Sequence, residues 1–425
     1  MIITESNQGG GLHGRATVEI KDAFFKQVKN SLNQKGYGQA ATELHYCDLT
    51  NLTGGTSFGA LSTIALCRID GRNGGNPYFS SPGEFGLYID KNAARIFPHN
   101  NGFFKTLFND PRQLLQGLKW ATQYSNKGLK SVLNDVIGPD AHFSDVRNDV
   151  IITMSTTEFL QGQDKAARVD VARFAKSHVA RGEGTLINDP TESLRKNWVL
   201  SEVVMASASP ASYLPGVALT NPNRDDYIIA QDGGFSGFNN PSIPVLNEAS
   251  FIYGSECSVE KASVIELGER QQVVKAYSLP KDLAHLHWGT GDFSTQNVSR
   301  TRKDALENTV LSMGVGSLIS APINGVHQYS LRTGAAAMEH YHNFDFNVAA
   351  APKQMHPDSD FTLSTPNQLS KLKDIGQWAA DQLSTQIAQV ADLVADAYID
   401  RLTYEKNNTS QLEYKNFLKQ QSCDL

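Results

Sequence analysis

The sequence contains little cysteine. Cys47, Cys67, Cys257 and Cys423 are the four cysteines in 425 residues, and no two of them form a C-x-x-C pair. Their wide spacing excludes a zinc ribbon and a thioredoxin-like motif, because both need closely spaced pairs. The pattern indicates free thiols in a reducing compartment rather than a disulfide framework.

Long apolar runs are also missing. No stretch approaches about 18 consecutive apolar residues, so we expect no transmembrane segment. Residues 1–11 contain neither a basic nor an apolar region, so we expect no signal peptide. The net charge of −6 and the pI near 6.0 exclude a general affinity for nucleic acid. These absences predict a cytoplasmic or soluble protein that meets lipid only peripherally, at membrane surfaces.

The composition that remains, 40% hydrophobic and 19% charged, is typical of a globular protein with a substantial core. Five short apolar runs predict buried strands, and apolar residues at helical spacing lie between them. Strands that alternate with helices predict an α/β fold, with three α/β/α layers and a mostly parallel central sheet. The five runs are residues 1–4, 46–53, 149–154, 227–231 and 285–288.

A different pattern begins near residue 367. Thr365-Pro366 is typical of a helix start, and an apolar stripe at helical spacing follows it. We therefore divide the chain into residues 1–350 and a helical C-terminal region, residues 351–425, packed on the first part. A separate oligomerisation element is the alternative. The stripe consists of Leu369, Leu372, Ile375, Ala379, Leu383, Ile387, Val390, Val394 and Ala397.

A serine-centred G-x-S-x-G motif follows the second apolar run. It reads Gly55-Thr56-Ser57-Phe58-Gly59, and an apolar helical segment comes after it. Gly55 and Gly59 allow the sharp strand-to-helix turn that exposes a nucleophilic serine above the edge of a sheet. The motif and its setting make Ser57 the candidate nucleophile.

A glycine run lies near the start of the chain. Gly9, Gly10 and Gly11 have unshielded amides that are suited to a developing oxyanion. Gly9, Gly11 and Gly14 also satisfy G-x-G-x-x-G, which is the alternative of a dinucleotide-binding oxidoreductase. That fingerprint needs an acidic residue about 20 positions further on, and Asp22 comes too early. The oxyanion interpretation is therefore favoured.

Asp232-Gly233-Gly234 follows the run 227–231. An aspartate at the carboxyl end of a buried strand lies where open α/β sheets place functional groups. The alternative is an aspartate that only tightens a turn. For a catalytic aspartate, we expect burial to raise its pKa and glycine amides to oppose that rise.

The order of these three segments resembles the patatin-like phospholipase family. That family has a glycine-rich oxyanion loop, then G-x-S-x-G, then D-G-G further on. The likeness includes the segments 88–98, 124–153 and 206–215, together with Asn239-Asn240-Pro241 and Gly289-Thr290-Gly291. It extends from about Gly9 to Gly291.

The resemblance implies a lipid acyl hydrolase of the phospholipase A or lysophospholipase type. Ser57 and Asp232 would form a catalytic dyad, and Gly9, Gly10 and Gly11 the oxyanion hole. No metal and no organic cofactor is implied. The substrate would be a lipid at a membrane surface, while an activating protein partner and a homo-oligomer stay open.

The chain departs from the family pattern in the oxyanion loop. Gln8 stands where the family usually has an acidic residue, and His13, with Arg15 two positions on, stands in place of the usual basic residue. The spacing from D-G-G to N-N-P is one residue longer than usual. These departures bear on the loop and on substrate preference, not on the dyad.

Two further interpretations concern other residues. His285 and His287 follow Ser57 and Asp232 in the chain order of an α/β-hydrolase triad, so a Ser-Asp-His esterase is an alternative. A non-catalytic lipid-binding or interaction protein on the same fold is another. Residues 103–120 are an amphipathic candidate that either docks on lipid or packs in the core.

Overall fold

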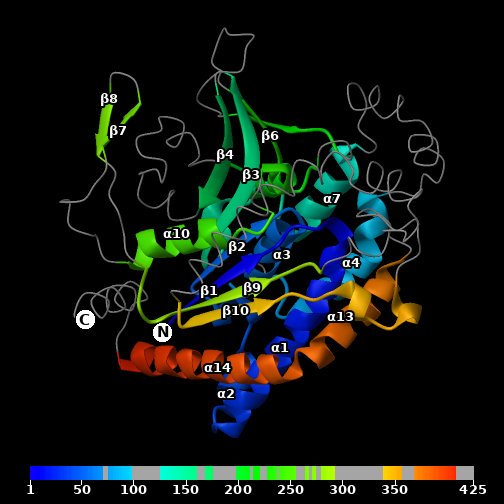
Figure 1. Cartoon of the computed structure of the whole chain (residues 1–425), viewed down its shortest axis with the longest axis vertical. Helices are drawn as coiled ribbons and strands as arrows, with labels where there is room; N and C mark the ends of the chain where they lie inside the picture. The colour runs from blue at the N-terminus through cyan, green and yellow to red at the C-terminus, as the bar shows by residue number, and fades with distance from the viewer. Residues whose placement is uncertain are drawn as a thin grey trace, which may run out of the picture.

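The centre of this computed structural model is a sheet of eight strands in the order β10-β9-β1-β2-β3-β6-β5, with β4 paired to β3 (Figure 1). A separate two-stranded sheet consists of β7 and β8. The structure describes residues 1–69, 75–97, 125–159, 168–175, 198–210, 214–220, 227–236, 239–254, 264–267, 270–273, 279–291, 338–356 and 368–407. The strands are β1 (Ile2–Asn7), β2 (Leu52–Thr56), β3 (Asp149–Phe159), β4 (Arg168–Ala175), β5 (Val217–Thr220), β6 (Tyr227–Asp232), β7 (Val264–Leu267), β8 (Arg270–Val273), β9 (Leu283–Trp288) and β10 (His340–Phe344).

Most of the central sheet is parallel, as the sequence predicts. The pairings from β10 through β9, β1 and β2 to β3 are parallel. The pairings of β3 with β4, β3 with β6 and β5 with β6 are antiparallel, which the sequence pattern did not indicate. The fold class is therefore α/β with a mixed, mostly parallel sheet.

Four of the five expected strands are present near the expected residues, and the fifth needs a correction. The run 46–53 is not one strand, because Tyr46–Leu49 forms a 3₁₀ helix (η2) and β2 begins only at Leu52. The backbone N–H of His45 donates to the Asp48 carboxylate at 2.9 Å, which caps this helical turn. A local cap therefore overrides the apolar pattern.

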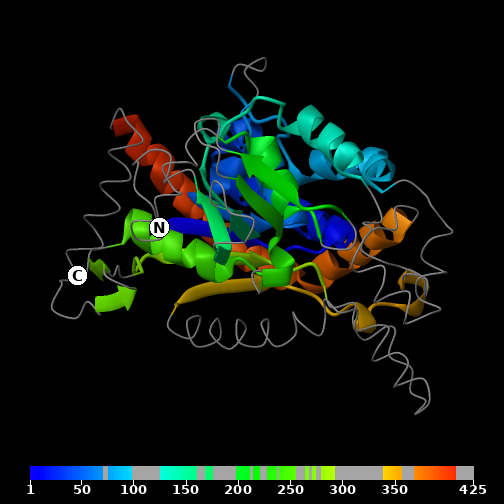
Figure 2. The same ribbon diagram turned by 90° about the horizontal axis from the view of Figure 1, so that it is seen from above.

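Helices cover both faces of the sheet. Because successive strand residues point to opposite faces, Ile2 packs with the α10 residues, whereas Ile3 packs in the core of α1 and α3. Figure 2 shows α10 and α4 on opposite sides of the strands, which confirms the three layers. The helices are η1 (Gly11–His13), α1 (Gly14–Gln34), α2 (Gly38–Glu43), α3 (Phe58–Cys67), α4 (Pro82–Ile96), α7 (Asn126–Val136), η4 (Phe143–Asp145), α9 (Leu200–Ser207), η6 (Gly233–Ser236), α10 (Ser242–Tyr253), η9 (Val348–Ala350), η10 (Lys353–Met355), α13 (Leu369–Gln382) and α14 (Ser384–Asn407).

The C-terminal apolar stripe belongs to two helices, α13 and α14, which pack on α1 (Figure 1). Most of the stripe is buried in the same core cluster as α1. Gly376 allows α13 to approach closely, because a Cβ there would lie 2.4 Å from the Ala16 carbonyl oxygen. The boundary at residue 350 stays a prediction. Within the described ranges, no helix is both long enough and apolar enough to cross a membrane.

A buried ion pair joins β1 to α1. Lys21 Nζ lies 2.5 Å from Glu5 Oε1, and the two side chains are only 1% and 2% exposed. The Lys21 ammonium also lies 5.1 Å from the Tyr46 ring centroid and 5.5 Å from that of Trp288. Desolvation lowers the pKa of Lys21, although the Glu5 charge opposes that shift. Because the pair is buried, removing either partner would leave an uncompensated charge and reduce the free energy of unfolding.

Replacing Lys21 by Met should reduce the free energy of unfolding by about 3–5 kcal/mol, because Glu5 would be left buried without its counter-charge. The measurement is urea denaturation at neutral pH. Lys26→Met on the same helix is the control: Lys26 is 72% exposed and pairs with Asp22, so its loss should cost less than about 1 kcal/mol. Equal effects of the two variants would contradict the prediction.

Candidate active site

Ser57 occupies the turn between β2 and α3. Its backbone has φ 56° and ψ −122°, and no other non-glycine residue in the described part of the chain has a positive φ. A non-glycine residue in this region stores strain of about 1–3 kcal/mol, and such strain is concentrated at functional sites. The turn therefore has the backbone geometry of a nucleophile elbow.

The two glycines of the motif are required by close backbone contacts. A Cβ on Gly55 would lie 2.4 Å from the carbonyl oxygen of Gly59. A Cβ on Gly59 would lie 2.1 Å from the carbonyl oxygen of Asn7, at the end of β1. Both positions therefore exclude any larger residue.

Ser207, the last residue of α9, supports the turn at Ser57 through hydrogen bonds. The Ser57 backbone N–H donates to Ser207 Oγ at 3.0 Å, and the Ser207 hydroxyl donates to the Thr153 carbonyl at 2.7 Å. Ser207 is fully buried. The sequence marks Ser207 only as part of the segment 206–215, because the contact with Ser57 spans 150 positions.

Asp232 reaches Ser57 because β2 and β6 meet end to end. Both strands pair with β3, in opposite directions: Thr56 lies opposite Thr153, and Asp232 lies opposite Met154. Their carboxyl ends therefore converge on neighbouring residues of one strand. Ser57, which follows Thr56 directly, then faces Asp232 across this junction.

The Asp232 carboxylate is buried and hydrogen-bonded. It is 4% exposed, accepts the Gly234 N–H at 2.7 Å, and lies close enough to the Ser57 side chain for the hydroxyl to lower its pKa. Its own N–H donates to the Ser209 carbonyl at 3.1 Å. Burial raises the pKa of Asp232 to about 6, while the nearby Ser57 hydroxyl and the Gly234 N–H oppose the rise. Both opposing effects match the expectation from the sequence.

The glycine run lies beside Ser57 because β1 is parallel to β2, with Asn7 opposite Gly55. A Cβ on Gly9 would lie 2.9 Å from the Ser57 Cβ. The Gly9 N–H, however, donates to the Asn239 carbonyl at 2.9 Å. This amide is therefore not available to an oxyanion. Within the described residues, the amides of Gly10 and Gly11 have no hydrogen-bond acceptor. Gly11 also needs to be glycine, since its φ is 53°.

Two helices begin at this site. Phe58 is the first residue of α3, where an amide has no partner inside its own helix. Gly14 starts α1, and a Cβ on it would lie 2.0 Å from the Phe58 ring. The Phe58 amide is a third candidate oxyanion donor, which the G-x-S-x-G motif itself would have indicated. The positive ends of both helix dipoles favour an anion here.

The two histidines that a Ser-Asp-His triad would need lie within hydrogen-bond distance of residues other than Ser57. Both ring nitrogens of His285 lie within hydrogen-bond distance of Thr4 and Ser6 hydroxyls, at 2.8 and 3.0 Å. Those of His287 lie 2.9 Å from Ser6 Oγ and 3.2 Å from Asn240 Nδ2. No ring nitrogen of either histidine is left for Ser57. The geometry therefore favours the dyad over the triad.

The basic side chains near the loop carry no available charge. Arg15 donates to both carboxylate oxygens of Asp90, at 2.7 and 3.0 Å, and to Glu19 at 2.6 Å. Burial lowers the pKa of His13 to about 3, so its ring is neutral at ordinary pH. Neither residue reproduces the basic group that the family has in this loop.

The remaining features of the chain do not contribute to this site in the described residues. The amphipathic segment 103–120 lies outside the described residues, so its role stays a prediction. A cavity of about 850 Å³ is lined by Arg68, Tyr78 and Tyr88, among others. It adjoins the C-terminal end of α3, whereas Ser57 precedes the first residue of that helix. In the described ranges, no group of three or more His, Cys, Asp or Glu side chains is arranged to hold a metal ion.

Comparisons with known proteins add little. No model of a protein family matches the chain, and no curated protein matches it. Among solved structures, human GIVD cytosolic phospholipase A2 is similar, with a TM-score of 0.35 and 10% sequence identity. The match covers 93% of this chain and 60% of the phospholipase, so the chain spans less than two thirds of that protein. A likeness this distant assigns no activity.

The raised pKa of Asp232 predicts a stability effect with a definite sign. Because the folded pKa of about 6 exceeds the ordinary aspartate value of 3.8, folding favours the protonated acid. Its contribution to stability is complete below pH 3.8 and is lost as the pH rises through about 6. Asp232→Asn should therefore raise the free energy of unfolding at pH 8 by about 2–3 kcal/mol.

The measurement is urea denaturation of wild type and Asp232→Asn at several pH values. The gain should shrink towards zero near about pH 4, where wild-type Asp232 is also neutral. A variant that is less stable than wild type at pH 8 would show that the charged carboxylate is not disfavoured by burial.

Proposed function

We propose that the protein is a serine-dependent lipid acyl hydrolase that cleaves carboxylic esters through Ser57 and Asp232. One observation carries the proposal: the strained serine at the elbow lies next to a buried aspartate, at the point where the strands that precede them meet on β3. An activated hydroxyl needs a base within hydrogen-bond distance, and this pair supplies both. The neighbouring glycine amides and helix N-termini supply the place for an oxyanion.

The reaction has two halves. Asp232 takes the proton from Ser57 as Oγ attacks the ester carbonyl, and the tetrahedral oxyanion accepts hydrogen bonds from Gly10, Gly11 and Phe58. The intermediate collapses to an acyl-serine, and Asp232 returns its proton to the departing alcohol. Asp232 then takes a proton from water, which attacks the acyl group. As this second tetrahedral intermediate collapses, Asp232 returns the proton to Ser57 Oγ, and the carboxylic acid leaves.

The environment of Asp232 suits a general base at neutral pH. A carboxylate with a pKa of about 6 is mostly ionised at pH 7, yet more basic than an exposed aspartate. The rate of ester hydrolysis should therefore rise with pH through about 6, because Asp232 must be ionised to accept the proton. Ser207, through its bond to the Ser57 amide, supports the geometry that this transfer needs.

The lipid part of the proposal rests on the motif resemblance to patatin-like phospholipases. It makes the substrate a phospholipid or lysophospholipid, reached from solution at a membrane surface. Arg15 and His13 supply no free cation in the oxyanion loop, so a headgroup phosphate would have to be bound by other residues. An activating protein and a homo-oligomer are compatible with the same site.

Ser57→Ala and Asp232→Asn should each reduce hydrolysis of a soluble p-nitrophenyl ester to background while the protein stays folded. The double variant should be no worse than either single variant, because the two residues act as one unit. Steady-state kinetics and labelling by a fluorophosphonate probe measure this effect.

Ser62→Ala is the matched control, since Ser62 is a buried serine of α3 outside the site. It should keep wild-type activity. A wild-type protein that neither hydrolyses the ester nor reacts with the probe would favour the non-catalytic lipid-binding alternative. A fully active Ser57→Ala would refute the nucleophile.

The substrate class has its own test. Wild-type protein should release free fatty acid from phosphatidylcholine or lysophosphatidylcholine vesicles, and Ser57→Ala should release none. Mass spectrometry of the extracted lipids identifies the acyl chain that is lost. Cleavage of soluble esters with no release from either lipid would contradict the lipid proposal but leave the dyad in place.

A further inference from the structure

The N–H and the carbonyl of Gly9 are both hydrogen-bonded to distant segments of the chain. Its N–H donates to the Asn239 carbonyl at 2.9 Å, and its own carbonyl accepts the Thr290 hydroxyl at 3.2 Å. Gly10 and Gly11 follow directly, so the position of Gly9 determines where their amides lie. The peptide between Asn239 and Asn240 is therefore a direct support of the oxyanion loop.

The side chain of Asn240 fixes that peptide. It is 4% exposed, and its Oδ1 accepts two hydrogen bonds from Ser242, from the backbone N–H at 2.9 Å and from the hydroxyl at 2.7 Å. Its Nδ2 lies 3.2 Å from His287 Nε2. Because a backbone N–H can only donate, Oδ1 must face Ser242 and the amide nitrogen must face His287.

This orientation determines the protonation of His287. The Asn240 nitrogen can only donate, so His287 Nε2 must be unprotonated and accept. The single proton of the neutral ring is then on Nδ1, which lies 2.9 Å from Ser6 Oγ and donates to it. One tautomer of His287 therefore satisfies both neighbours, and the protonated ring would satisfy only one of them.

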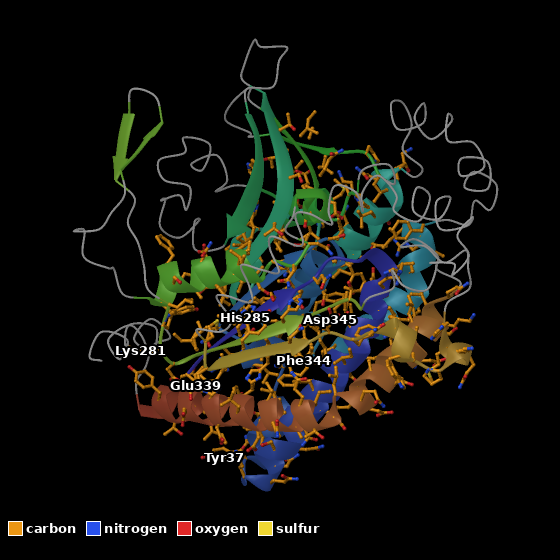
Figure 3. All side chains as sticks on the ribbon, viewed as in Figure 1. Tyr37, Lys281, His285, Glu339, Phe344 and Asp345 are labelled. Atoms are coloured by element: carbon orange, nitrogen blue, oxygen red, sulfur yellow. The ribbon has the colours of Figure 1, made fainter. Side chains whose placement is uncertain are left out.

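The network continues into the sheet. Ser6 Oγ lies 3.0 Å from His285 Nε2, and His285 Nδ1 lies 2.8 Å from Thr4 Oγ1. The Thr4 hydroxyl donates to the Ala284 carbonyl at 3.3 Å. Figure 3 shows His285 within the sheet, beside the strands that carry these residues. Side chains of β1 and β9 thus anchor a turn that lies outside the sheet.

We propose that Asn240 and His287 are positioning residues for the oxyanion loop. They act on Gly10 and Gly11 through the Asn239 carbonyl and Gly9, and neither needs to contact the substrate. The role rests on the proposed function, because it concerns the transition state of the same hydrolysis. It also gives a reason for the buried hydrogen-bond network between β1 and β9, at positions where apolar side chains could pack instead.

The first test separates kcat from KM. Asn240→Ala should lower kcat for a soluble p-nitrophenyl ester by ~10-fold to 100-fold, since misplaced amides weaken oxyanion binding. KM should change by less than about twofold, because the oxyanion exists only in the transition state.

Asn148→Ala is the matched control. Asn148 is also a buried asparagine that holds a turn, donating to the carbonyls of Cys47 and Thr50 at 2.6 and 2.7 Å. It lies at the start of β3, away from Ser57. This variant should lower the melting temperature and leave kcat unchanged below that temperature.

A pair of variants at His287 tests the specific bond. Glutamine places its side-chain oxygen near the position of Nε2, so His287→Gln can still accept the hydrogen bond from Asn240. Asparagine places its amide near the position of Nδ1, so His287→Asn can contact Ser6 but not Asn240. His287→Gln should keep several-fold more kcat than His287→Asn, a difference that loss of stability alone would not produce.

Four outcomes decide the inference. The expected outcome is a selective loss of kcat in folded Asn240→Ala and His287→Asn, with partial retention in His287→Gln. Folded Asn240→Ala with wild-type kcat, while Ser57→Ala is inactive in the same assay, would overturn the positioning role and leave the dyad intact. If Asn240→Ala does not fold, equal kcat for the two His287 variants overturns the role instead. An active Ser57→Ala would remove the proposed function and this role together.

Discussion

The site depends on one constraint of the sheet, namely that β2 and β6 approach the same side of β3 from opposite directions. β3 is long enough to pair with both, first in parallel with β2 and then antiparallel with β6. The pairing register therefore sets the separation of Ser57 and Asp232. A shift of either strand along β3 would separate the hydroxyl from the carboxylate.

Around this junction, several buried polar groups are each held by a second group. Ser207 holds the Ser57 amide, Gly234 holds the Asp232 carboxylate, and Asn239 holds Gly9. Buried polar groups that are fully hydrogen-bonded are rigid, because any displacement leaves a donor or acceptor unsatisfied. The strained backbone of Ser57 persists for the same reason, since its neighbours leave it no relaxed alternative.

Local sequence patterns predicted much of this arrangement. Contacts between segments that are far apart in the sequence could not be predicted in the same way. The glycine spacing around Ser57 predicted the elbow, because close backbone contacts admit no Cβ. The direction of β6 was not predictable, since both a parallel and an antiparallel strand can be apolar and end in aspartate. The occupied amide of Gly9 and the support from Ser207 both depend on partners more than 100 positions away. The 3₁₀ turn at 46–49 was missed because a polar cap interrupted an apolar run.

The end-to-end meeting of β2 and β6 also brings together two residues that are far apart in the sequence. More than 60 residues connect the end of β3 to the start of β6, and they include β4, α9 and β5. The position of Asp232 is set by the pairing of β6 with β3 and β5 and by its bond to Ser209. Insertions between these elements, rather than within them, would change the surface of the connection and leave Ser57 and Asp232 in place, since lengthening a loop costs little free energy. Over evolutionary time, the loops of this connection can change in length while Ser57 and Asp232 stay in register.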